Sequence, residues 1–112
     1  MKIKYPLAKE TINDEDVDAL CTWLKSYPRL TKGQLTLDVE EKWAEYIGTR
    51  YAVFNNSGSS ANLLAVFAAC NPLRRNRFKP GDHAIIQSLC WPTSLWPLVQ
   101  AGLKINFVDI NP

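Results

Sequence analysis

A short polar turn between two apolar runs constrains the fold of this chain more than any other feature. The turn covers residues 55–62 (NNSGSSAN), and it separates the apolar residues 51–54 from the apolar residues 63–68. This order predicts a strand, a tight turn and a helix. The first amides of such a helix have no carbonyl partner and lie at the positive end of the helix dipole, so the turn is suited to bind a phosphate group.

The same turn also has a simpler interpretation. Ser and Asn are common N-cap residues, and Gly is a common turn residue, so the turn by itself leaves both interpretations open. The glycine spacing of dinucleotide-binding folds is absent, and no Gly-Lys-Ser/Thr of a nucleoside-triphosphate loop follows. A phosphate bound here would therefore belong to another class of ligand.

Composition and charge exclude several classes of protein. With 112 residues, 46% of them hydrophobic and 21% charged, the chain has the composition of a globular protein of at most one domain. A net charge of +2 is too even to predict a nucleic-acid or membrane surface. No signal peptide or membrane-length apolar run is visible, so we expect a cytoplasmic location. The basic residues within 74–79 fit either a solvated loop or a contact to a nucleotide diphosphate.

The cysteines do not form a metal-binding or disulfide pattern. Cys21, Cys70 and Cys90 are widely spaced, and His83 is the one histidine of the chain. We therefore predict no metal site and no disulfide framework. Cys21 and Cys70 fall within helical apolar patterns and are expected to be buried, which suits a reducing compartment.

The order of elements predicts an α/β fold with a mostly parallel sheet. We expect helices over residues 13–25, 36–47, 59–70 and 93–101, and strands over residues 51–54, 83–88 and 104–109. The second helix should bury Val39, Trp43, Tyr46 and Ile47. Ligands of such sheets bind outside the carboxyl ends of the strands, where residues 57–59 and 89–91 both lie.

Two features of the end of the sequence raise further expectations. Three short strands would leave the edges and faces of a sheet open, so we expect these residues to be the first part of a longer polypeptide. In the loop after the second strand, the indole of Trp91 either stacks on a planar cofactor ring or packs in the core. Trp96, one helical turn later, is expected in the core.

Several motifs together resemble the opening of the DegT/StrS family. They are residues 31–33 (TKG), 51–53 (YAV), 56–62 (NSGSSAN), 80–82 (PGD) and 107–109 (FVD), in the order and spacing of that family. Members are fold-type I enzymes that use pyridoxal or pyridoxamine phosphate to remodel nucleotide-linked keto sugars. The resemblance runs from about Tyr5 to Asp109 and covers roughly the first third of such an enzyme.

The resemblance implies both a fold and a division of the chain. The fold is the N-terminal part of a three-layer α/β/α large domain with a mostly parallel sheet. Residues 1–34 would form an N-terminal helix and connector, and residues 35–112 would form the first part of the cofactor-binding domain. Residues 5–8, 60–64 and 71–79 favour the 3-dehydratases, which act on a GDP-linked 4-keto-6-deoxy sugar, over the aminotransferases.

The resemblance also implies roles for individual residues. Gly58 and Ser59 would donate hydrogen bonds to the phosphate of pyridoxal 5'-phosphate or pyridoxamine 5'-phosphate, with Ser60 as a helper. Trp91 matches the aromatic residue that stacks on the pyridine ring, and Ser94 matches a hydroxyl residue close to the cofactor.

The remaining implications concern the substrate, the partner subunit and catalysis. Thr31, Lys32 and Gly33 match a connector that approaches the nucleotide sugar near the interface of a homodimer. The acid/base Lys or His, and the Asp that pairs with the pyridine nitrogen, would lie beyond Pro112, so the 112 residues alone should be inactive. The alternative is a non-catalytic α/β module that binds a phosphate or assembles with a partner through its open sheet.

Overall fold

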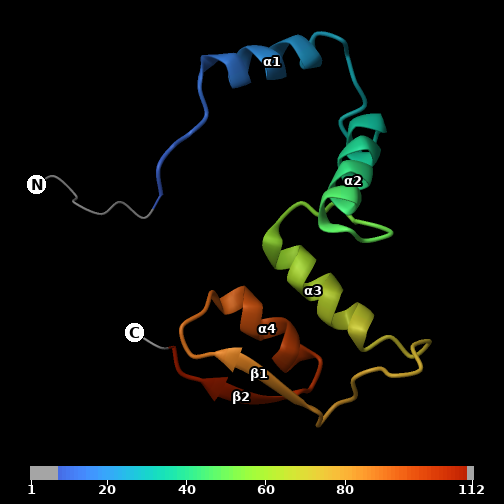
Figure 1. Ribbon diagram of the computed structural model, residues 1–112, viewed down its shortest axis with the longest axis vertical. Helices are drawn as coiled ribbons and strands as arrows, with labels where there is room; N and C mark the ends of the chain where they lie inside the picture. Colours follow the sequence, from blue (N-terminus) through green and yellow to red (C-terminus); the bar gives the residue numbers. More distant parts are fainter. Residues whose placement is uncertain (1–7, 111–112) are drawn as a thin grey trace, which may run out of the picture. The chain divides into compact units, whose positions relative to one another are not determined.

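The computed structural model describes residues 8–110, which form four helices and two strands (Figure 1). In chain order they are α1 (Asp14–Leu24), α2 (Gln34–Ile47), α3 (Gly58–Ala69), β1 (His83–Gln87), α4 (Pro92–Gln100) and β2 (Lys104–Val108). They belong to two compact units, one ending at Ala52 and one beginning at Val53. The first unit therefore contains α1 and α2, and the second contains the remaining elements.

Helix α1 begins where the sequence predicts. The Asn13 side chain accepts the Asp16 N–H at 3.0 Å, and the Asp16 carboxylate accepts the Asn13 N–H at 3.0 Å. This reciprocal capping box satisfies two amides that the helix itself leaves without partners. Acidic residues in the first turn add a favourable interaction with the helix dipole.

Helix α2 starts two residues earlier than predicted and ends as predicted. Its N-cap is Gly33, and the first residue, Gln34, donates from its side-chain amide to Asp38 at 2.8 Å. Gly48 ends the helix in the left-handed region, at φ 78°. Glycine adopts this conformation without the steric cost that other residues pay, which is why it marks the end of the helix.

The predicted burial of the apolar face of α2 is wrong for the described residues. Val39, Trp43, Tyr46 and Ile47 are exposed, and only Ala44 of this helix is buried. The Trp43 and Tyr46 rings pack against each other, with centroids 5.6 Å apart. Helical periodicity predicts which face is apolar, whereas burial needs a second surface that the pattern does not contain.

The sheet of the second unit is parallel, as predicted. β1 pairs with β2 in a register that places Ala84 opposite Ile105 and Ile86 opposite Phe107. α4 connects the two strands, and it contacts both β2 and α3 (Figure 1). The sequence therefore forms a strand, a crossover helix and a parallel strand, with α3 packed on the crossover helix.

Two glycines fix the amino ends of the strands. Gly81 (φ 92°) donates its N–H to the Gly102 carbonyl at 2.8 Å, and Gly102 has φ 73°. A Cβ atom at Gly102 would lie 3.1 Å from Cβ of Pro80. Both the backbone conformation and the close approach therefore require glycine at position 102.

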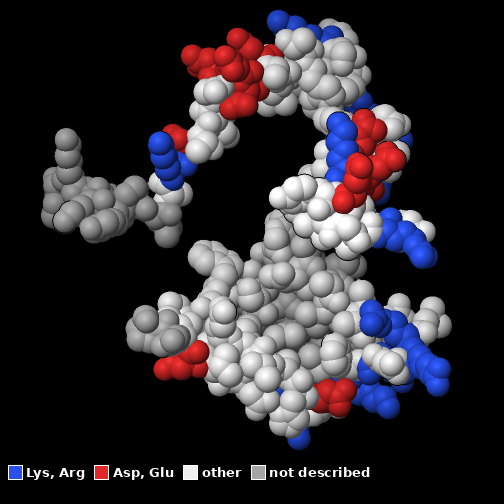
Figure 2. Space-filling view, viewed as in Figure 1, with Lys and Arg blue, Asp and Glu red and all other residues white. Residues whose placement is uncertain are grey.

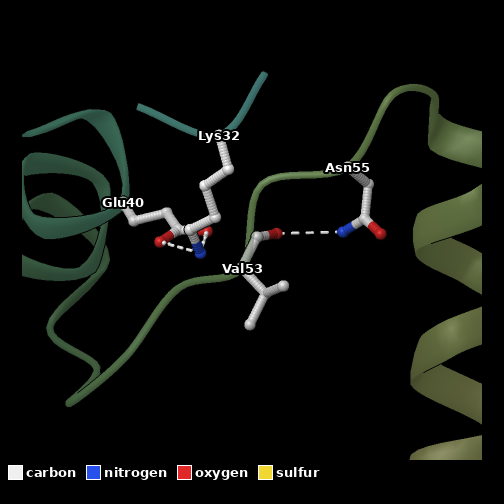
Figure 3. A network of polar contacts seen from close by, with 4 residues as sticks. All are labelled: Lys32, Glu40, Val53 and Asn55. Atoms are coloured by element: carbon white, nitrogen blue, oxygen red, sulfur yellow. Dashed lines mark hydrogen bonds and ion pairs between the residues drawn. The ribbon is translucent and has the colours of Figure 1, made fainter. Parts of the chain in front are cut away.

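Residues 51–54 do not form the predicted strand. Within residues 8–110 they are not part of any strand, and Tyr51, Val53 and Phe54 are exposed. The Val53 carbonyl instead accepts the Asn55 side-chain amide at 2.9 Å (Figure 3). An apolar run predicts a buried strand only when a neighbouring strand is present to pair with it.

Three further burial predictions are corrected. Cys21 is exposed and Cys70 is half-buried. Trp96 is 54% exposed and does not lie in a core. The apolar face of α3, including Leu63 and Phe67, is also exposed. The cause is the same as for α2, because the described residues do not supply a covering layer for these faces.

Candidate functional site

The start of α3 is a set of backbone donors at the end of a polar turn. Ser57 is the N-cap, and its hydroxyl accepts the Ser60 N–H at 3.2 Å while its carbonyl accepts the Ala61 N–H at 3.0 Å. Gly58 and Ser59 are the first two residues of the helix, so their amides have no intrahelical acceptor. The Ser60 hydroxyl lies 3.2 Å from that of Ser57.

The space above this turn is open. Gly58 and Ser59 are exposed, and a Cβ atom added at Gly58 would meet no atom within 4 Å. The surrounding protein therefore does not require a glycine here, whereas a ligand that approaches the backbone closely would. The open turn, the free amides and the dipole fit a phosphate group.

The start of α4 presents an indole and a hydroxyl. Trp91 is the N-cap in an extended conformation, and its side chain is 73% exposed. Its carbonyl accepts the N–H of Ser94 at 2.9 Å, and Ser94 is half-buried in the first turn of the helix. Trp91 does not pack in a core of the described residues, so its ring is available to a planar ligand.

The two helix starts lie beside each other. The Asn62 side-chain amide, in the first turns of α3, donates to the Thr93 carbonyl in the first turn of α4 at 3.4 Å. α4 begins just beyond the carboxyl end of β1, the edge where parallel sheets bind ligands. The structure therefore brings the start of α3 and the start of α4, where Trp91 lies, close together.

The predicted substrate residues belong to the first compact unit. Lys32 forms an ion pair with Glu40, with distances of 2.8 and 2.9 Å from Nζ to the two carboxylate oxygens (Figure 3). The Lys32 side chain is 58% exposed and that of Glu40 is 13% exposed. Thr31 accepts the Arg29 Nε–H at 2.7 Å, and Gly33 caps α2.

Other polar groups lie at the opposite end of the strands. The His83 ring, at the amino end of β1, lies 2.8 Å from the side-chain amide of Asn106 on β2. The basic side chains at 74–79 gather over the loop that follows α3 (Figure 2), where Arg77 donates to the Pro72 carbonyl at 2.9 Å. This loop leads into the amino end of β1, so its charges do not belong to the site at the carboxyl end.

The sequence analysis did not predict that Asn62 would join α3 to α4. The signal that could have revealed it is Pro97, because a proline inside a helix leaves a carbonyl one turn earlier without its usual donor. That signal shows only that a carbonyl is free. It does not show which side chain reaches it.

Comparison with known proteins shows the family of this chain. A family model described as the DegT/DnrJ/EryC1/StrS aminotransferase family matches residues 10–112. The chain belongs to this family. It is 38% identical over 109 residues to a GDP-4-keto-6-deoxy-D-mannose 3-dehydratase of Yersinia pseudotuberculosis. The aligned residues cover 97% of this chain and 27% of the relative.

Two more similar proteins extend the comparison. The lipopolysaccharide biosynthesis protein RfbH of Salmonella typhimurium is 41% identical over 83 residues, which cover 73% of the chain and 19% of the relative. A solved structure of the E. coli GDP-4-keto-6-deoxy-D-mannose-3-dehydratase with bound hydrated PLP superposes with a TM-score of 0.82 at 39% identity, covering 99% of this chain and 28% of that one. The chain therefore spans about a quarter of the length of these relatives.

These similarities confirm the predicted fold class. The protein is an α/β chain with the fold of the N-terminal part of a fold-type I enzyme. Within residues 8–110, no cluster of three His, Cys, Asp or Glu side chains is arranged to hold a metal ion. None of the helices described is both long enough and apolar enough to cross a membrane.

Proposed function

We propose that the chain is the N-terminal part of an enzyme that uses pyridoxal 5'-phosphate or pyridoxamine 5'-phosphate to act on a nucleotide-linked 4-keto-6-deoxy sugar. The reaction is a 3-dehydration or a transamination, and the names of the relatives favour the 3-dehydration of a GDP-linked sugar. The observation that carries this proposal is the pair of adjacent helix starts, one with free amides and one with an exposed indole.

The residues of the second unit fit such a cofactor. The amides of Gly58 and Ser59 would hold the phosphate, with the Ser60 hydroxyl beside them. Trp91 would cover one face of the pyridine ring, and Ser94 would lie close to it. When bound, the cofactor supplies an electron sink for the reacting carbon of the substrate. These residues bind and orient it, and the indole excludes water from one face.

The connector of the first unit fits the diphosphate of a nucleotide sugar. Lys32 carries a compact positive charge, and the ion pair with Glu40 fixes the direction in which its ammonium points. The Thr31 hydroxyl and the Gly33 backbone lie next to it in the chain. We propose that Thr31, Lys32 and Gly33 contact the substrate, while the acid/base Lys or His lies beyond Pro112.

We also propose an oligomeric state, a location and a domain division for the enzyme. We propose a homodimer in the cytoplasm. Its sugar product would serve lipopolysaccharide or a related cell-surface polysaccharide, which agrees with the name of the Salmonella relative. We assign residues 1–34 to an N-terminal helix and connector, and residues 35–112 to the first part of the cofactor-binding domain. The length of the relatives supports a domain that continues beyond this sequence.

An absorbance scan of the full-length enzyme with pyridoxal phosphate, before and after borohydride, tests the proposal. Covalent fixation of the cofactor by borohydride would indicate a lysine and an aminotransferase. Bound cofactor that borohydride does not fix would indicate a histidine and a dehydratase. Absence of cofactor binding would refute the proposed function and favour a non-catalytic module.

A further inference from the structure

A proline inside α4 leaves one carbonyl of that helix without its usual donor. In a regular α-helix the N–H of residue 97 donates to the carbonyl of residue 93. Residue 97 is proline, which has no N–H, and it is buried. The Thr93 carbonyl, in the first turn of α4, is therefore available to a donor from elsewhere.

Asn62 supplies that donor from the neighbouring helix. Its Nδ2 atom lies 3.4 Å from the Thr93 oxygen, which is long for a hydrogen bond between an amide and a carbonyl. The side-chain amide must present its NH2 group here, because its oxygen would face another oxygen. One polar side chain thus joins the second turn of α3 to the first turn of α4.

The position of this bond relates it to both halves of the candidate site. Asn62 is four residues after Gly58, which places it about one helical turn from the phosphate-binding amides. Thr93 is two residues after Trp91. A bond between them therefore fixes the separation of the phosphate-binding turn and the indole. A cofactor whose phosphate and ring are covalently joined needs that separation to be constant.

We infer that Asn62 and Pro97 act together as a positioning pair for the cofactor site. Pro97 leaves the Thr93 carbonyl without a helical donor, and the Asn62 side chain donates to that carbonyl, which joins the start of α4 to α3. This inference rests on the proposed function for its ligand. The bond itself, and its dependence on Pro97, belong to the protein without any ligand.

The matched variants follow from the chemistry of the bond. Asn62→Asp keeps the shape of the side chain and replaces the donor with an acceptor. Asn76→Asp introduces the same charge in the loop at the other end of the strands and serves as the control. Pro97→Ala gives residue 97 an N–H that can donate to Thr93, so the helix no longer depends on Asn62.

The first readout is amide hydrogen exchange in the full-length enzyme without cofactor. We expect residues 94–96 to exchange faster in Asn62→Asp than in the wild type and in Asn76→Asp, because the first turn of α4 loses its tie to α3. Equal exchange in all three proteins would overturn the inference. Because no ligand is present, this result does not depend on the proposed function.

The second readout is a double-mutant cycle on pyridoxamine phosphate binding. Asn62→Ala should weaken binding by about three- to tenfold, the usual effect of one hydrogen bond. In the Pro97→Ala background the same change should weaken binding less than about twofold, since Thr93 then has a helical donor. Equal losses in both backgrounds would overturn the inference. If the wild type does not bind the cofactor, the proposed function fails, and the exchange experiment alone decides the inference.

Discussion

Replacing Trp91 with alanine should separate ligand binding from folding. The indole is 73% exposed, so roughly a quarter of its surface, about 60 Å² of a side chain of about 250 Å², is covered by the described residues. At about 25 cal/mol per Å², the cost to the free energy of unfolding is at most about 1.5 kcal/mol. A tryptophan in a core would instead cost about 3–5 kcal/mol.

Loss of stacking should affect the cofactor more specifically. We expect Trp91→Ala to weaken pyridoxal phosphate binding by about 1–2 kcal/mol, which is roughly 5- to 30-fold in Kd. A fluorescence titration of the full-length enzyme measures this Kd, and urea denaturation measures the unfolding. Trp96→Ala is the matched control, because Trp96 is also exposed on α4 and has no proposed role. An unchanged Kd together with a loss of 3 kcal/mol or more in unfolding free energy, by the core values above, would refute the reasoning.

The remaining predictions use glycine geometry and the ion pair of the connector. Gly102→Ala should lower the free energy of unfolding by about 1–3 kcal/mol, because position 102 has a positive φ and a Cβ would approach Pro80, and urea denaturation would show this. Gly58→Ala should leave the free energy of unfolding nearly unchanged, since no atom lies within 4 Å of an added Cβ at Gly58. It should weaken cofactor binding several-fold in the same titration, since the added methyl group would meet the proposed phosphate. Lys32→Gln should raise KM for the nucleotide sugar several-fold while the Kd of the cofactor stays constant, and steady-state kinetics beside a cofactor titration would separate the two. Glu40→Gln should raise the same KM less than Lys32→Gln, because the ammonium remains and only its direction is released.

Elements that depend on local chemistry could be predicted from the sequence. The start of α1 after Asn13 and its end-of-helix counterpart in α2, the left-handed Gly48, follow from patterns a few residues long. The parallel pair of β1 and β2 follows from the order of a strand, a helix and a strand along the chain. The turn at Gly58 belongs to the same group, because free amides at a helix start are a property of the turn itself.

The burial of apolar residues and individual contacts between distant side chains could not be predicted. Residues 51–54 have the composition of a strand but are not part of a strand within residues 8–110, and Trp96 has the spacing of a core residue but is exposed. The bond between Asn62 and Thr93 needs both the missing N–H of Pro97 and the packing of α3 on α4. Sequence periodicity does not show that α3 packs on α4, or which side chain reaches the Thr93 carbonyl.

The hydrogen bond between Gly81 and Gly102 lies at the amino end of the sheet, away from the candidate site at the carboxyl end. The bonds from Gly81 to Gly102 and from Lys104 to Asp82 set the register of β1 and β2 before either strand reaches the ligand-binding edge. Residues at the carboxyl end of the strands can then be substituted without a change in the register of β1 and β2. A laboratory library can therefore vary residues at the carboxyl end of the strands other than Trp91 and Ser94, while positions 80–82 and 102–104, which set the register, are left untouched.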